Sequence, residues 1–137
     1  MTALIALDDS PRAPHVFAAG TELARLTGAE VVLVRVLTEP TDIPPAAHTQ
    51  PSHLDDEVEQ AVRAEFGRLM DSSPGVRFGA PIVVAGDPWR RILEVADRIG
   101  ADLIVMGNHR PHGVERVLGT VASRVVSHAD RSVLLVR

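Results

Sequence analysis

Two glycines and a threonine in the last third of the chain form a pattern that could bind phosphate. Gly107 ends an apolar run, and Gly119 stands directly before Thr120, where a stretch with helical spacing begins. The first N–H groups of a helix have no partner inside the helix, and the helix dipole is positive at that end, so a helix start can hold an anion. The pattern therefore predicts a phosphate site. The alternative is an ordinary strand turn at Gly107 and an ordinary helix cap at Gly119 and Thr120.

The elements that would position this pattern alternate between strands and helices. Apolar runs and helical spacings predict strands near residues 3–7, 30–37, 76–85, 102–106 and 132–136, and helices near 14–26, 58–69, 88–99 and 122–129. The second helix has one acidic residue in its apolar stripe, Glu65, which is expected at the edge of the stripe. The alternation predicts an α/β protein with a three-layer, doubly wound, open parallel sheet of five strands and four helices. With 137 residues, the chain 1–137 is expected to be a single domain.

A doubly wound sheet binds its ligands beyond the carboxyl ends of its strands, at the point where the strand order reverses. The segments after the first and fourth predicted strands, residues 8–11 and 107–119, are therefore the expected walls of a site. Spacing alone does not give the strand order.

The composition excludes several kinds of chemistry. The chain has no Cys and no Tyr, and every basic side chain is Arg. A thiolate nucleophile, a Schiff-base or Walker lysine, a tyrosine acid and a thiolate zinc site are therefore impossible. The net charge of −4 gives no general attraction to nucleic acid, and the apolar runs are too short to span a membrane. Without cysteines or a basic N-terminal leader, the expected compartment is the cytoplasm.

Four stretches of the chain together resemble the universal stress proteins in their short single-domain form. They are LIALDDSP at residues 4–11, GDPWRRILEVA at 86–96, ADLIVMGNH at 101–109 and VLGTVASRVVSHADRSVLLVR at 117–137. The likeness covers nearly the whole chain, and the combination is specific. The resemblance implies an open sheet of strand order 3-2-1-4-5 and a homodimer paired through the last strand, Ser132 to Val136.

The resemblance also implies an adenine-nucleotide site, with one departure. ATP-binding members of the family have a glycine, two residues, a second glycine, and then about nine residues before Gly-Ser or Gly-Thr, in a loop that wraps the phosphates. Gly107, Gly119 and Thr120 match that pattern, but Arg110 stands where the second glycine belongs, and the loop is about one residue shorter. An arginine there costs roughly 1–2 kcal/mol if the left-handed conformation is required. It can equally supply a guanidinium fork to phosphate, so the sign of its effect is open.

The other side of the implied site is the nucleoside side. Asp8 matches the family's acidic residue that contacts ribose or adenine, and its alternative role is to cap the turn before the first helix. Val36 matches the residue that lines the adenine pocket, with a plain core valine as the alternative. Met106 and Val121, next to Gly107 and Thr120, complete the predicted nucleotide-binding residues.

Four further side chains carry weaker signals. His109 and His112 are interpreted as polar loop residues, because no helix aligns them and no third ligand accompanies them, so no metal site is predicted. Mg²⁺ would instead arrive with the nucleotide phosphates. Arg116 either neutralises phosphate or is solvated. Trp89 is expected in surface packing or a partner contact.

The favoured function is a dimeric stress-response module that binds ATP or AMP and acts by binding rather than by fast catalysis. The alternative is a nucleotide-free interaction protein whose phosphate loop is altered at Arg110. An enzyme, at most a slow ATP hydrolase, is not favoured, because the sequence offers no nucleophile–base pair beside the loop.

Overall fold

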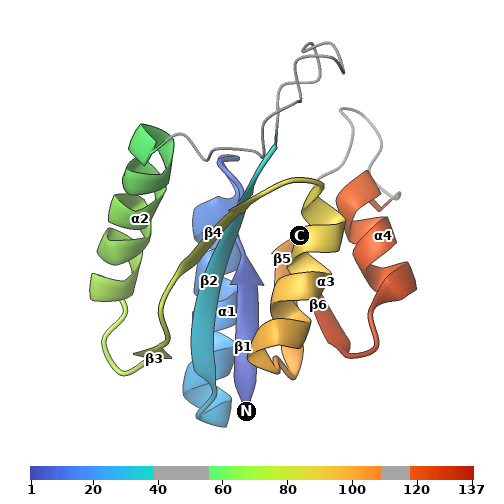
Figure 1. Cartoon of the computed structure of the whole chain (residues 1–137). Coiled ribbons are helices and arrows are strands. Elements are labelled where there is room, and N and C mark those ends of the chain that lie inside the picture. Colours follow the sequence, from blue (N-terminus) through green and yellow to red (C-terminus); the bar gives the residue numbers. More distant parts are fainter. Residues whose placement is uncertain (39–55, 109–117) are drawn as a thin grey trace.

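The computed structural model describes residues 1–38, 56–108 and 118–137 (Figure 1). The elements in chain order are β1 Thr2–Ala6, α1 Ala13–Thr27, β2 Glu30–Leu37, α2 Asp56–Asp71, β3 Arg77–Phe78, β4 Ile82–Ala85, α3 Pro88–Ile99, β5 Leu103–Gly107, α4 Thr120–His128 and β6 Ser132–Val136. Among these described residues, no helix has the length and apolar character needed to cross a membrane.

The strands form one parallel sheet in the order β3-β2-β1-β5-β6, with β4 also paired to β2. The predicted α/β class with a parallel sheet and four helices is confirmed. The predicted count of five strands is wrong, because the third strand is divided into β3 and β4, which changes the strand order as numbered. The break falls at 79–81, where Pro81 has no N–H to offer a sheet ladder.

Helices cover both faces of the sheet and make two apolar cores. On one face, residues of α1 and α2 such as Phe17 and Phe66 pack on Ile5, Leu33 and Val105. On the opposite face, residues of α3 and α4 pack on a second set of strand side chains that includes Leu4, Val34 and Ile104. Because neighbouring strand residues face opposite ways, Leu4 and Ile5 belong to different cores and both are fully buried. The result is three layers (Figure 1).

Proline and glycine set several helix boundaries. Pro88 lies in the first turn of α3, where its missing N–H costs nothing. Gly28 after α1 and Gly100 after α3 adopt left-handed conformations with φ of 73° and 66°, which a residue with a Cβ disfavours.

The carboxyl ends of the central strands lie together, at what we call the carboxyl edge of the sheet. Ala6 at the end of β1 is in register with Val34 of β2 and with Met106 of β5. The first residues after β1 and β5, Leu7 and Asn108, therefore leave the sheet at neighbouring positions. Helix α4 leads into β6, which is parallel to β5, so α4 starts near this same edge.

Candidate functional site

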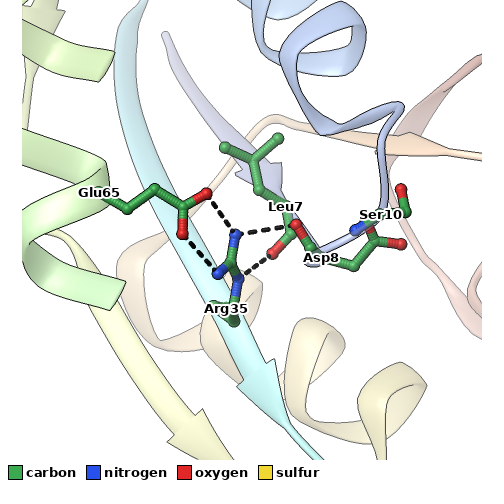
Figure 2. Close-up of polar contacts among 5 residues, drawn as sticks. All are labelled: Leu7, Asp8, Ser10, Arg35 and Glu65. Carbon is green, nitrogen blue, oxygen red and sulfur yellow. Dashed lines mark hydrogen bonds and ion pairs between the residues drawn. The ribbon is translucent and has the colours of Figure 1, made fainter. Parts of the chain in front are cut away.

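The segment that follows β1 is held by the side chain of Arg35 from β2. Its Nε donates a hydrogen bond to the carbonyl oxygen of Leu7 at 2.9 Å, and its Nη2 donates to the carbonyl oxygen of Asp8 at 2.8 Å (Figure 2). Both carbonyls lie beyond the last residue of β1. The guanidinium therefore satisfies two backbone acceptors at the place where the strand ends.

The charge of Arg35 is balanced by Glu65 from α2. The Arg35 side chain is only 7% exposed, and its Nη1 and Nη2 lie 2.8 Å and 3.2 Å from the two carboxylate oxygens of Glu65. The guanidinium carbon also lies 5.3 Å from the centre of the Phe66 ring. A buried cation needs such partners, because desolvation of an unpaired charge is costly. Glu65 is thus a partner of a buried arginine as well as a residue at the edge of the apolar stripe of α2.

The carboxylate of Asp8 shapes the turn before α1 and keeps one oxygen open. Its Oδ1 accepts a hydrogen bond from the N–H of Ser10 at 3.0 Å, which is the local turn role that the sequence allowed (Figure 2). Asp8 is exposed, and within the part of the chain that the structure describes its Oδ2 accepts no hydrogen bond. That oxygen can therefore accept a hydrogen bond from a ligand hydroxyl or amine.

On the neighbouring strand, Asn108 joins the end of β5 to the start of α4. Its Oδ1 accepts a hydrogen bond from the N–H of Gly119 at 2.9 Å, and its own N–H donates to the carbonyl oxygen of Val136 at 3.1 Å. The structure thus brings Gly107 and Gly119 close, although 11 residues separate Asn108 from Gly119. Asn108 was not identified from the sequence. Its place directly after a strand, as an amide next to Gly107, was the available signal.

The two predicted phosphate-site glycines have ordinary backbone angles. Gly119 is the N-cap of α4 with φ of −61°, so its backbone does not demand glycine. At Gly107, a Cβ would lie 3.1 Å from Cγ2 of Val16 in α1, so close packing favours glycine there. Among the residues that the structure describes, no side chain caps α4, and Thr120 is its exposed first residue. The first-turn N–H groups of α4 therefore have no partner within the helix, and this end of α4 can hold an anion.

The three apolar candidates lie on the α3 and α4 face of the sheet. Met106 is buried in that core, whereas Val36 and Val121 are partly buried and pack against it. Val36 lies within β2, next to the carboxyl end of the strand, and Val121 is in the first turn of α4. The two valines can therefore border an apolar ligand group, while Met106 supports them from the core.

Four of the remaining candidates are not placed by the structure. Arg110, Arg116, His109 and His112 lie outside the described residues. In the described ranges, no group of three or more His, Cys, Asp or Glu side chains could hold a metal ion.

Trp89 makes the surface packing that the sequence allowed. The centre of the Trp89 ring lies 4.6 Å from the centre of the His128 ring. The guanidinium carbons of Arg90 and Arg124 lie 5.1 Å and 5.7 Å from the centre of the Trp89 ring.

Comparison with known proteins agrees with this architecture over the whole chain. The universal stress protein A homolog 1 of Coxiella burnetii is 26% identical over 136 residues, which cover 97% of this chain and 93% of that protein. A solved universal stress protein in complex with cAMP matches with a TM-score of 0.73 at 23% identity, covering 100% of this chain and 97% of the other. A universal stress protein from Archaeoglobus fulgidus in complex with dAMP gives a TM-score of 0.70 at 24% identity, with coverage of 100% and 98%.

The two solved structures establish a shared fold at these identities. The model of the universal stress protein family, in turn, matches residues 1–137. The chain therefore belongs to the universal stress protein family.

Proposed function

We propose that this protein binds an adenine nucleotide, ATP or AMP, at the carboxyl edge of its sheet, and acts through binding rather than fast catalysis. One observation carries the proposal: two adjacent parallel strands, β1 and β5, are followed by a carboxylate oxygen and by a helix start that have no hydrogen-bonding side-chain partner in the described part of the chain. The first group accepts hydrogen bonds and the second attracts an anion. A nucleoside phosphate offers both complementary groups in one molecule.

The proposed roles divide along this edge. Asp8 contacts the ribose or the adenine, and Val36, Met106 and Val121 form or support the apolar border of the base. Gly107, Gly119 and Thr120 form the phosphate side, where backbone N–H groups and the Thr120 hydroxyl can donate hydrogen bonds.

Arg110 belongs to the phosphate side by its position in the sequence, and it either blocks or supports the phosphates. Mg²⁺ would be held mainly by the phosphates, because the described residues near the edge form no acidic cluster.

The ligands of the two solved relatives favour this choice. One is bound to cAMP and the other to dAMP, and both ligands contain adenine, a sugar and one phosphate. AMP is therefore the first nucleotide to test, followed by ATP with and without Mg²⁺.

We also propose that the chain is a single nucleotide-binding domain that forms a homodimer through β6. Strand β6 is at one end of the sheet order, and an edge strand offers unpaired backbone N–H and C=O groups. Leu134 of β6 is 36% exposed, and Val126 of α4 is also exposed. A second copy that pairs along β6 would satisfy the backbone groups.

A nucleotide-free interaction protein is the second candidate, because Arg110 replaces the glycine expected in the phosphate loop. On this alternative, wild-type protein carries no nucleotide, and Arg110→Gly creates binding. Nucleotide that co-purifies with the wild-type protein contradicts it.

A thermal-shift assay tests the proposed function. AMP or ATP present at about one hundred times its Kd should raise Tm by roughly 5–10 °C, because a ligand held only by the folded state stabilises it by mass action. GMP serves as the matched control for the base, and the mass of any small molecule released on denaturation identifies a resident ligand. The absence of any shift at millimolar AMP and ATP would contradict the proposal.

A further inference from the structure

In the part of the chain that the structure describes, the hydrogen bonds of the Arg35 side chain go either to the turn that carries Asp8 or to helix α2. The guanidinium makes four hydrogen bonds, two to the carbonyls of Leu7 and Asp8 and two to the carboxylate of Glu65. Figure 2 shows the guanidinium between the turn after β1 and α2. A single side chain thus connects β2, the turn after β1 and α2.

Apolar packing alone does not explain a charged pair at this place. Val31 and Leu33, four and two residues before Arg35 on the same face of β2, are fully buried apolar residues in the core with α1 and α2. An apolar residue at position 35 would continue this pattern without burying a charge, and buried ion pairs are often no more stabilising than apolar replacements. It would, however, leave the carbonyls of Leu7 and Asp8 without these donors. What an apolar side chain cannot do is hold two successive carbonyls in fixed directions.

The two held carbonyls determine how Asp8 leaves the sheet. The carbonyls of Leu7 and Asp8 belong to the peptide units on the two sides of the Asp8 Cα. Fixing both peptide units fixes the backbone dihedrals of Asp8, and with them the direction of its Cα–Cβ bond. The hydrogen bond from the Ser10 N–H to Oδ1 then sets the orientation of the carboxylate on that bond. Glu65 fixes the guanidinium in turn, because a bidentate carboxylate pair allows only one planar orientation.

Resting on the proposed nucleotide binding, we infer that Arg35 and Glu65 are positioning residues of the nucleotide site, which aim the Asp8 carboxylate at the nucleoside. Helix α2 is thereby coupled to ligand affinity, although Glu65 need not contact the ligand. Of these three residues, only Asp8 contacts the nucleoside. The Arg35–Glu65 pair reduces the number of directions in which the Asp8 carboxylate can point.

A double-mutant cycle for AMP affinity tests this inference. Glu65→Gln removes the counter-charge and one of the two parallel hydrogen bonds while keeping the size of the side chain. We expect it to weaken AMP binding about three- to tenfold in the wild-type background, as coupled residues of one network do. In the Asp8→Ala background, Glu65→Gln should have almost no further effect on Kd, because the group that it positions is absent.

Glu59→Gln is the matched control. Glu59 lies on the same helix and pairs with Arg63 at 3.0 Å, and among the described residues the hydrogen bonds of this pair join the two side chains and the carbonyl oxygen of Pro81, not the turn after β1. This variant should bind AMP like the wild type. Glu65→Ala serves as a second variant with a complete loss of the pair, and circular dichroism verifies that each protein is folded.

The possible results separate this inference from the proposed function. If wild-type protein does not bind AMP or ATP, the proposed function is wrong and the inference falls with it. If wild-type protein binds AMP and Glu65→Gln binds equally well, only the inference is overturned. An equal loss of affinity in the wild-type and Asp8→Ala backgrounds also overturns it, because that result indicates a general structural effect without positioning of Asp8.

Discussion

The two sides of the proposed site are held in place by different kinds of interaction. The turn after β1 is fixed by a buried guanidinium that reaches Glu65, 30 residues away in sequence, and makes charge-assisted hydrogen bonds. The start of α4 is held to the end of β5 by a neutral hydrogen bond from the Gly119 N–H to Asn108 Oδ1, two residues 11 positions apart. The nucleoside side therefore depends on the tertiary structure, and the phosphate side on a short local contact. Substitutions of the groups that hold each side in place should affect both stability and ligand affinity on the first side, and mainly ligand affinity on the second.

The largest effect is expected from Arg35→Met. This change leaves two inward-facing carbonyls of the turn without donors, and each unsatisfied buried acceptor costs about 1–3 kcal/mol. We expect the free energy of unfolding to fall by about 3 kcal/mol, as measured by urea denaturation. An unchanged unfolding midpoint would show that the guanidinium is not needed to hold the turn.

Glu65→Ala should have a smaller effect on the same side. Removal of one partner of a fully buried pair costs about 3–5 kcal/mol, but Glu65 is 40% exposed, so water can solvate part of the remaining charge. We expect a loss of about 1–2 kcal/mol by denaturation. Glu59→Ala, which breaks the more exposed pair with Arg63, should cost less than about 0.5 kcal/mol. Equal losses in the free energy of unfolding for Glu65→Ala and Glu59→Ala would contradict the expected difference between the buried pair and the more exposed pair.

On the phosphate side, Asn108→Asp should change affinity far more than stability. The aspartate keeps the oxygen that accepts the Gly119 N–H, so the free energy of unfolding should stay within about 0.5 kcal/mol of wild type. Its negative charge beside the start of α4 should weaken ATP binding about tenfold and leave adenosine binding unchanged. Calorimetric titration with both ligands measures this difference. An equal loss for both ligands would place the phosphates elsewhere.

The local parts of the fold could be predicted well from the sequence, because strand burial and helix spacing depend on the pattern of residues close together in the chain. The strand alternation, the four helices and the helix ends at Gly28 and Gly100 follow from such patterns. The division of the third strand was missed, although Pro81 lies within it. Apolar residues on both sides of Pro81 favoured one long strand and hid the single missing N–H that stops the sheet ladder there.

The candidate site was predictable only in part. The glycines, Thr120 and Asp8 form motifs that can be recognised in the sequence. The pairing of Arg35 with Glu65 cannot be, because it depends on how α2 packs against β2 in the folded chain. In the sequence, Glu65 is only an acidic residue in an apolar stripe, and Arg35 is only an interruption in a strand.

Calorimetric titration of AMP into the wild-type protein and the Asp8→Ala variant tests the central claim most directly. We predict saturable binding to the wild-type chain and a clearly weaker Kd for Asp8→Ala, because the carboxylate is the proposed nucleoside contact. No binding of AMP at millimolar concentration, or the same Kd for both proteins, would contradict a nucleotide site at the carboxyl edge that includes Asp8.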